Sequence, residues 1–257
     1  MPKADPAAPQ RVLASQTLFR GLDVIDAVAS GSTTLPAISE KTGITLSTTH
    51  RLASALVQQR YLKFEARKGY SLGTKLIELG FLAHRQLDLP KHARAFLEKL
   101  AADTRDTVHL AALDNQEVIY LDKMAGQRAV EISSRIGGRK LVCSTGVGKA
   151  LMLDQGEAAW RAQYAHDAAL GGCGQSEEEW LALMRSYAAK GYTFDLGEDA
   201  PLIRCVAAPI RDASGRIVAA ISVSGALDYM DEARLADLVP VVRSVADAIS
   251  EQLGARN

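Results

Sequence analysis

Between positions 18 and 72 the spacing of apolar residues changes from the period of helices to the period of strands. The predicted elements are helices over residues 18–30, 35–42 and 46–59, followed by short strands over residues 61–64 and 70–72. Gly31 and Gly43 follow the first two helices as stop residues, and Thr34 is in position to cap the second. Three helices, with a short glycine-containing turn between the second and third and a hairpin after the third, predict a winged helix-turn-helix.

The charge of the chain is divided unevenly along its length. Lys and Arg number 30 and Asp and Glu number 30, so the formal net charge is zero. The first 75 residues hold ten Lys or Arg against five Asp or Glu, so the excess of positive charge lies there. A basic first third favours an anionic partner such as nucleic acid, although an imbalance of this size is common in proteins generally.

The third predicted helix begins with residue types that bind DNA. In a helix-turn-helix the N-terminal residues of the second helix of the motif enter the major groove, where hydroxyl groups and arginine bind phosphates or base edges. The predicted DNA-contacting residues are Ser47, Thr48, Thr49, His50 and Arg51 in this helix and Arg67 and Lys68 in the hairpin. The alternative interpretation is that residues 47–49 only cap the helix and that Arg51 lies on a solvated face. Helix count, turn, hairpin and charge together favour DNA binding.

The rest of the chain predicts a second, mixed domain. The predicted boundaries are a disordered tail at 1–10, a winged helix-turn-helix DNA-binding domain at 11–73, linker helices at 74–104 and a sensor-like domain at 105–257. In the last domain, strands are predicted at 108–113, 118–123, 130–135, 192–196, 204–210 and 217–224, and helices at 147–153, 157–164, 177–190 and 232–253. Strands before and after a helical middle indicate an α+β domain with an antiparallel sheet.

Several classes of protein are excluded. No apolar run reaches the 18 residues of a membrane span, and the first residues lack the apolar stretch of a secretory signal. Three cysteines fit neither a disulfide framework nor a zinc ribbon, so we expect a globular protein of the cytoplasm. No Ser/His/Asp order or metal-ligand spacing is present, and His109 is predicted to be a hydrogen-bonded strand histidine rather than a catalyst. We therefore expect no enzyme activity, metal or cofactor.

The segment Ser144–Lys149 loosely resembles a phosphate-binding loop. Such a loop would need glycine at position 143 and a hydroxyl at 150, where this chain has Cys143 and Ala150. We interpret the segment as the start of a helix whose free N–H groups suit an anion such as a carboxylate. The alternative is that its glycines only permit tight packing against a sheet.

The strand predicted near the C-terminus has two different faces. Ser222 and Ser224 lie with Val218 and Ala220 on one face, whereas residues 219, 221 and 223 are apolar and lie on the other. Small residues ending in two hydroxyls suit a cavity that hydrogen-bonds a polar ligand, or equally an outer solvated face.

Two blocks of sequence resemble a known family. The segments SQTLFRGLDVIDAVAS, LPAISEKTGITLSTTHRLASALVQQRYLK and GYSLGTKLIELG resemble the DNA-binding domain of IclR-type bacterial transcriptional regulators. IGGRKLVCSTGVGKALM and RCVAAPIRDASGRIVAAISVSG resemble their second domain, so the similarity runs from about residue 11 to 253. The resemblance implies a winged helix-turn-helix joined by a linker helix to a GAF-like effector domain. It also implies homodimers or tetramers that bind pseudo-palindromic operators in double-stranded DNA in response to a small metabolite.

The resemblance also implies where the effector, the small molecule that controls such a regulator, would bind. The matching positions are Gly146, Val147, Asp195, Cys205, Ser222 and Ser224. We predict a small organic acid with its carboxylate at the amides of residues 146 and 147 and at the two serines, and its hydroxyl or oxo group near Asp195. The chain departs from the family around residues 196–198, 202–203 and at Glu131, so a sugar acid, an aromatic acid and an oxo-acid all stay open. The remaining alternatives are a winged helix used for protein contacts without any ligand and, less favoured, an enzyme.

Overall fold

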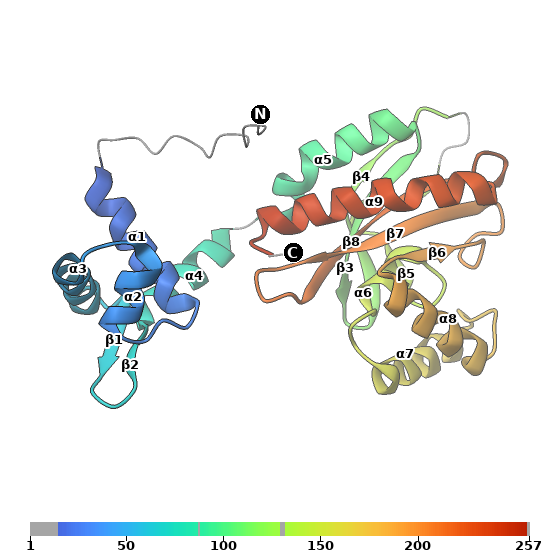
Figure 1. The fold of residues 1–257 in the computed structure, drawn as a ribbon. Helices are drawn as coiled ribbons and strands as arrows, with labels where there is room; N and C mark the ends of the chain where they lie inside the picture. Colours follow the sequence, from blue (N-terminus) through green and yellow to red (C-terminus); the bar gives the residue numbers. More distant parts are fainter. Residues whose placement is uncertain (1–14, 87, 129–131, 256–257) are drawn as a thin grey trace, which may run out of the picture. The chain divides into compact units, whose positions relative to one another are not determined.

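The computed structural model describes residues 15–86, 88–128 and 132–255, and the chain divides into two compact units at residues 86 and 87 (Figure 1). The tail predicted at residues 1–10 lies outside the described residues. No helix in the described ranges is long and apolar enough to cross a membrane.

The N-terminal unit is a winged helix-turn-helix, as predicted. Its elements are α1 (Gln16–Ala29), α2 (Leu35–Thr42), α3 (Leu46–Gln58), β1 (Leu62–Glu65), β2 (Gly69–Leu72) and α4 (Thr74–Gln86). Thr34 caps α2 by accepting a hydrogen bond from the amide of Ala37, and Gly43 ends it in the left-handed conformation. Its core contains Val24, Ala27, Val28, Ile38, Ile44, Leu52, Ala53, Leu62 and Tyr70.

The hairpin β1–β2, here called the wing, is fixed to the loop between α1 and α2. The amide of Tyr70 donates to the carbonyl of Thr33 at 2.8 Å. Gly69 has a φ of +80°, and a Cβ at this position would lie 2.1 Å from the same carbonyl oxygen. Glycine is therefore required where the wing meets the helices.

The C-terminal unit is built on one antiparallel sheet. Its elements are α5 (Leu89–Thr104), β3 (Thr107–Asp114), β4 (Glu117–Met124), β5 (Arg139–Leu141), α6 (Gly146–Leu151), α7 (Glu157–Ala169), α8 (Glu177–Lys190), β6 (Thr193–Asp195), β7 (Ile203–Arg211), β8 (Ile217–Ala226), the 3₁₀ helix η2 (Leu227–Tyr229) and α9 (Glu232–Gln252). The strand order is β5-β4-β3-β8-β7-β6, so the first and last long strands are neighbours at the centre. The α+β class and the antiparallel sheet predicted from sequence are confirmed.

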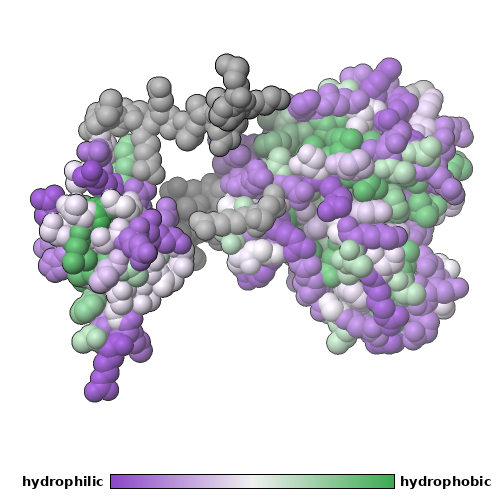
Figure 2. Space-filling view, viewed as in Figure 1, coloured by the Kyte–Doolittle hydropathy of each residue, from purple (hydrophilic) through white to green (hydrophobic). Residues whose placement is uncertain are grey.

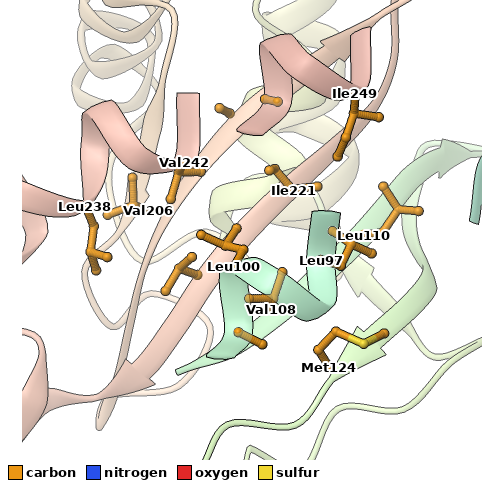
Figure 3. Close-up of a cluster of buried hydrophobic side chains, with 14 of the residues drawn as sticks. Leu97, Leu100, Val108, Leu110, Met124, Val206, Ile221, Leu238, Val242 and Ile249 are labelled. Carbon is orange, nitrogen blue, oxygen red and sulfur yellow. The ribbon is translucent and has the colours of Figure 1, made fainter. Parts of the chain in front are cut away.

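Helices cover both faces of this sheet (Figure 1). α5 and α9 pack on one face, where Leu97, Leu100, Val108, Ile221 and Val242 lie in one buried apolar cluster (Figure 3). On the other face a second cluster joins Ala207 and Ala220 of the sheet to α6 and α8. The predicted alternation of β8 holds from residue 219 to 223, because residues 219, 221 and 223 belong to the first cluster and Ala220 to the second. It is wrong for Val218, which was predicted on the face of Ala220 but packs against the first cluster, where the pairing of β7 with β8 shifts register.

The strand predicted at residues 130–135 is wrong in the part that the structure describes. Residues 132–135 form no strand, and residues 129–131, with Glu131, lie outside the described residues. The carbonyls of Ile132 and Ser134 accept hydrogen bonds from Lys123 Nζ at 2.6 and 2.8 Å instead of joining a strand ladder. The edge strand forms later, at β5, which pairs with β4.

The two helices predicted as a linker differ in their packing. α5 buries Ala93, Leu97 and Leu100 in the core of the C-terminal unit. Of the two helices, only α4 lies outside that unit.

Candidate functional sites

The start of α3 presents polar side chains to the surface. Ser47, His50 and Arg51 are exposed, and Thr48 is half-buried. The N-cap residue Thr45 makes no side-chain capping bond and instead donates to Thr48 Oγ1 at 3.0 Å. The helix therefore does not use the side chains of residues 47 and 48 as caps, and the exposed groups stay open to a ligand such as DNA.

Thr49, unlike its neighbours in α3, is not at the surface. Its side chain is fully buried, and its hydroxyl donates to the carbonyl of Ile44 at 3.4 Å. The prediction that Thr49 contacts DNA is corrected here, because Thr49 lies on the buried face of α3, whereas Ser47, His50 and Arg51 lie on its exposed face.

The wing carries the second group of predicted DNA contacts. Arg67 and Lys68 are exposed at its tip, which is strongly hydrophilic (Figure 2). Glu65 lies 2.8 Å from Lys63 Nζ and 3.3 Å from Lys68 Nζ, and hydrogen bonds from these two lysines lower its pKa. Glu65 is thus ionised and offsets part of the positive charge of the wing.

A groove joins the two groups. It encloses about 750 Å³ between α3, the start of α2 and the wing. His50, Ser54, Phe64, Arg67 and Lys68 are among its lining residues. The structure therefore places His50 of α3 and the basic residues of the wing around one surface.

The predicted effector residues lie on the sheet face that α6 covers. Cys205 pairs with Asp195 on one side and with Ser224 on the other, so these three form a row across β6, β7 and β8. In the next row, Ser222 pairs with Ala207 and with His109 of β3. Directly paired residues of neighbouring strands project from the same face.

His109, Ser222 and Ser224 form a buried polar cluster. Nδ1 of His109 lies 3.4 Å from the Oγ atom of each serine, and the two serine oxygens lie 3.3 Å apart. His109 Nε2 lies 2.6 Å from Ser134 Oγ, and its ring centroid is 4.8 Å from that of Tyr120. Burial, helped by the positive charge of Lys123, lowers the pKa of His109 to about 3, so its imidazole is neutral.

The first turn of α6 lies directly against this face. A Cβ on Gly146 would come within 2.5 Å of Cys205 Sγ, so only glycine allows the close approach. Thr193 Oγ1 donates to the carbonyl of Gly146 at 2.7 Å, and Val147 is buried in the cluster between α6 and the sheet. Burial, and then the charge of Asp195, raise the pKa of Cys205 to about 12, which keeps it a neutral thiol. Gly146 therefore permits tight packing against the sheet, as the alternative interpretation of this segment expected.

Asp195 begins a loop of acidic residues. Its Oδ1 accepts from the amides of Gly197 and Glu198 at 2.9 and 2.8 Å. Burial, and then the nearby carboxyl of Glu198, raise the pKa of Asp195 to about 7. Burial would also raise the pKa of Glu198, but Lys149 opposes it and leaves that pKa lowered. Lys149 is itself fully buried and lies 2.7 Å from Glu198 Oε1.

Sequence reasoning missed part of this site. His109 is hydrogen-bonded in its strand, as expected, but its partners are the predicted effector serines. Alternation along β3 could have placed His109 on the same face as Thr107 and Ala111, but it could not have placed His109 beside β8. No sequence pattern indicated that Ser134, Lys149 or Glu198 belongs to this site. In the described ranges, no group of three or more His, Cys, Asp or Glu side chains is placed to hold a metal ion.

A winged helix-turn-helix followed by a separate α+β domain with a buried polar site is the architecture of a ligand-responsive DNA-binding transcriptional regulator. Residues 17–66 match the family described as "IclR helix-turn-helix domain", and residues 81–251 match "Bacterial transcriptional regulator IclR C-terminal". The chain belongs to the IclR family of bacterial transcriptional regulators.

Individual relatives agree. The chain is 31% identical over 245 residues to the HTH-type transcriptional regulator XynR of Escherichia coli, covering 93% of this chain and 97% of XynR. The crystal structure of Pseudomonas aeruginosa HmgR has the same fold, with a TM-score of 0.79 at 23% identity over 94% of this chain and 99% of HmgR. An IclR homolog from Microbacterium hydrocarbonoxydans, complexed with 4-hydroxybenzoate, matches with a TM-score of 0.57 at 24% identity over 93% and 99% of the two chains.

Proposed function

We propose that this regulator controls catabolic genes by binding a small organic acid at the cluster of His109, Ser222 and Ser224. The observation that carries the proposal is the loose bonding of this cluster. Contacts of 3.3 to 3.4 Å are long for hydroxyl donors, which normally reach about 2.8 Å. Buried polar groups are expected to be well paired, so two buried serine hydroxyls with only long contacts, on one face, favour a missing partner.

The chemistry of the surrounding residues supports an acid. A carboxylate would accept hydrogen bonds from both serine hydroxyls and from the amides of Gly146 and Val147. Asp195, whose pKa lies near 7, would hydrogen-bond a hydroxyl or oxo group on the same molecule, with Cys205 beneath it. The 4-hydroxybenzoate complex of one IclR homolog supports testing an aromatic acid beside a sugar acid and an oxo-acid.

The test of this site is binding of three acids, 4-hydroxybenzoate, pyruvate and D-gluconate, measured by calorimetry. We expect one of them to bind the wild-type chain and its affinity to fall at least about tenfold in the double variant Ser222→Ala, Ser224→Ala. Ser244→Ala, an exposed serine of α9, is the matched control. Equal affinity in the double variant and the control would overturn the assignment.

We further propose that α3 and the wing read a pseudo-palindromic operator in double-stranded DNA. The proposed contacts are Ser47, Thr48, His50, Arg51, Arg67 and Lys68. A footprint upstream of the chain's own gene should show paired protected half-sites that Arg51→Ala loses. Lys190→Ala, a surface lysine of the C-terminal unit, should footprint normally. Protection that Arg51→Ala retains in full would contradict the proposed reading by α3.

Paired half-sites imply at least a homodimer, and we propose α4 as its seam. Ile77 and Leu82 expose 74% and 51% of their surface, and Leu79 exposes 38%. The side chain of Phe81, in the same helix, lies outside the described part of the chain. Light scattering of Ile77→Ser, Leu82→Ser should show a smaller particle than wild type. An unchanged mass would place the dimer or tetramer contacts elsewhere.

A further inference from the structure

A line of hydrogen-bonding groups leads from the buried serines to the segment of residues 132–138. Ser222 and Ser224 face His109 Nδ1, and Ser134 faces Nε2 on the other side of the ring. Ser134 is half-buried, while Ser133 and Arg135 on either side of it are exposed. His109 therefore connects the interior of the C-terminal unit to a segment that reaches its surface.

Segment 132–138 is held firmly around this contact. Lys123 Nζ donates to the carbonyls of Ile132 and Ser134, and the amide of Gly137 donates to the carbonyl of Tyr120 at 2.8 Å. These bonds fix the backbone on both sides of the Ser134 hydroxyl, which is itself free to rotate. The charge of Lys123 also opposes a positive charge on His109. The ring thus keeps one N–H donor and one acceptor nitrogen, as a relay requires.

We infer that His109, within the proposed effector site, couples the occupancy of Ser222 and Ser224 to the hydrogen bonding of Ser134. The inference rests on the proposed function, because it requires an acid to bind the two serines. In the unoccupied site a serine hydroxyl donates to Nδ1. The ring proton then lies on Nε2 and is donated to Ser134 Oγ.

A bound carboxylate reverses this direction. Both serine hydroxyls donate to the carboxylate, which leaves only serine oxygen atoms facing Nδ1. The N–H bond at Nε2 breaks and one forms at Nδ1, with water taking up and supplying the exchanged proton, so the charge of the ring does not change. Nε2 becomes an acceptor, and the Ser134 hydroxyl turns to donate to it. Binding of the effector thereby changes the hydrogen bonding of segment 132–138, although the effector does not contact this segment.

The first experiment uses the full chain without any acid. Nitrogen NMR of the histidine rings distinguishes the two neutral tautomers. We expect His109 to carry its proton on Nε2, Ser134→Ala to shift the Nε2 signal, and Ser222→Ala, Ser224→Ala to shift the Nδ1 signal. Ser133→Ala is the matched control and should shift neither. A His109 spectrum that is the same in all of these variants would overturn the inference.

The second experiment adds whichever of 4-hydroxybenzoate, pyruvate and D-gluconate binds in calorimetry. We expect the His109 proton to move to Nδ1. Ser134→Ala should bind the acid within about threefold of wild type but lose most of the acid-dependent change in operator affinity. His109→Asn, whose amide lies near the position of Nδ1, should bind the acid more weakly than wild type, and at saturating acid it should lose most of the change in operator affinity. His109→Gln, whose amide lies near Nε2, should retain more of the response.

The outcomes separate the two proposals. An acid that binds wild type and changes its operator affinity, with an unmoved His109 proton and a normal response in Ser134→Ala, overturns the relay and leaves the proposed function intact. If none of the three acids binds, the proposed function fails and the relay fails with it.

Discussion

Asp195 is a buried carboxylic acid whose nearest charged neighbours are the carboxyl of Glu198 and the ammonium of Lys149. Lys149 is paired with Glu198 and opposes the shift only weakly, so burial, and then the carboxyl of Glu198, raise the pKa of Asp195 to about 7. A carboxyl whose pKa is higher in the folded chain than in the unfolded chain favours folding in its protonated form. Its contribution to stability is therefore present below about pH 4 and is lost as the pH rises to about 7.

Asp195→Asn should remove this loss. The amide oxygen of asparagine can still accept from the amides of Gly197 and Glu198, and it never ionises. We expect wild type and variant to have similar free energies of unfolding at pH 4, and the variant to be more stable by on the order of 1–3 kcal/mol at pH 8. Urea unfolding at the two pH values measures the difference. Curves that stay parallel would show that Asp195 does not titrate in this range.

Thr49 allows a second test at the residue scale, because it is buried in the core beside residues that we propose contact DNA. Thr49→Val keeps the shape of the side chain and removes its bond to Ile44. We expect a loss of about 0.5–1.5 kcal/mol in stability and an operator affinity within about twofold of wild type. Hydrogen exchange of residues 16–72 and a binding isotherm report the two quantities. A large loss of operator affinity in a stable Thr49→Val variant would show that Thr49 does contribute to DNA binding.

The elements followed from the sequence where periodicity was strong. α2 and α8 have the predicted bounds because capping and stop residues act locally: Thr34 and Gly43 flank α2, and Ser176 and Gly191 flank α8. β5 was missed because three residues, two of them charged, show no alternation. The pattern of residues 130–135 suited a strand, but Lys123 takes up carbonyls there.

Helix α5 shows a different limit. Its apolar stripe predicted a helix with one buried face, but not that this face packs in the core of the C-terminal unit. Leu97→Ala tests the answer, since loss of a fully buried leucine should cost the C-terminal unit about 2–5 kcal/mol. Trp160 and Trp180, both buried in that unit, report its unfolding by fluorescence. Lys99→Ala, on the exposed side of α5, is the control, and equal stability of the two variants would mean that α5 packs loosely.

The candidate effector site was predictable only where it depends on a local pattern. Alternation along β8 placed Ser222 and Ser224 on one face. That they meet His109 depends on pairing between β3 and β8, which no local pattern encodes. The burial of Lys149 depends on a partner in a distant loop, Glu198.

The whole molecule separates its charges between two units. The basic first third forms the DNA-binding head, and the proposed effector site lies within the other unit. Each function can therefore be measured without the other, and each should respond differently to salt.

Operator binding should weaken steeply with salt. The proposed contacts from Arg51, Arg67 and Lys68 to phosphates would release bound cations, so we expect the affinity to fall more than about tenfold between 50 and 200 mM salt. Fluorescence anisotropy of labelled operator measures this fall. Arg67→Ala should make it shallower, while Lys190→Ala should not. A slope that Arg67→Ala leaves unchanged would remove the wing from the phosphate contacts.

The central strands of the sheet, β3 and β8, come from opposite ends of the C-terminal unit, and His109 and Ser222 are 113 residues apart in the chain. During synthesis on the ribosome, the head can emerge and fold long before this pair can meet. A chain interrupted between residue 87 and β8 would then retain a DNA-binding head with no means of sensing its effector. Premature stop codons in the second half of such a gene should therefore produce unresponsive regulators rather than merely absent ones.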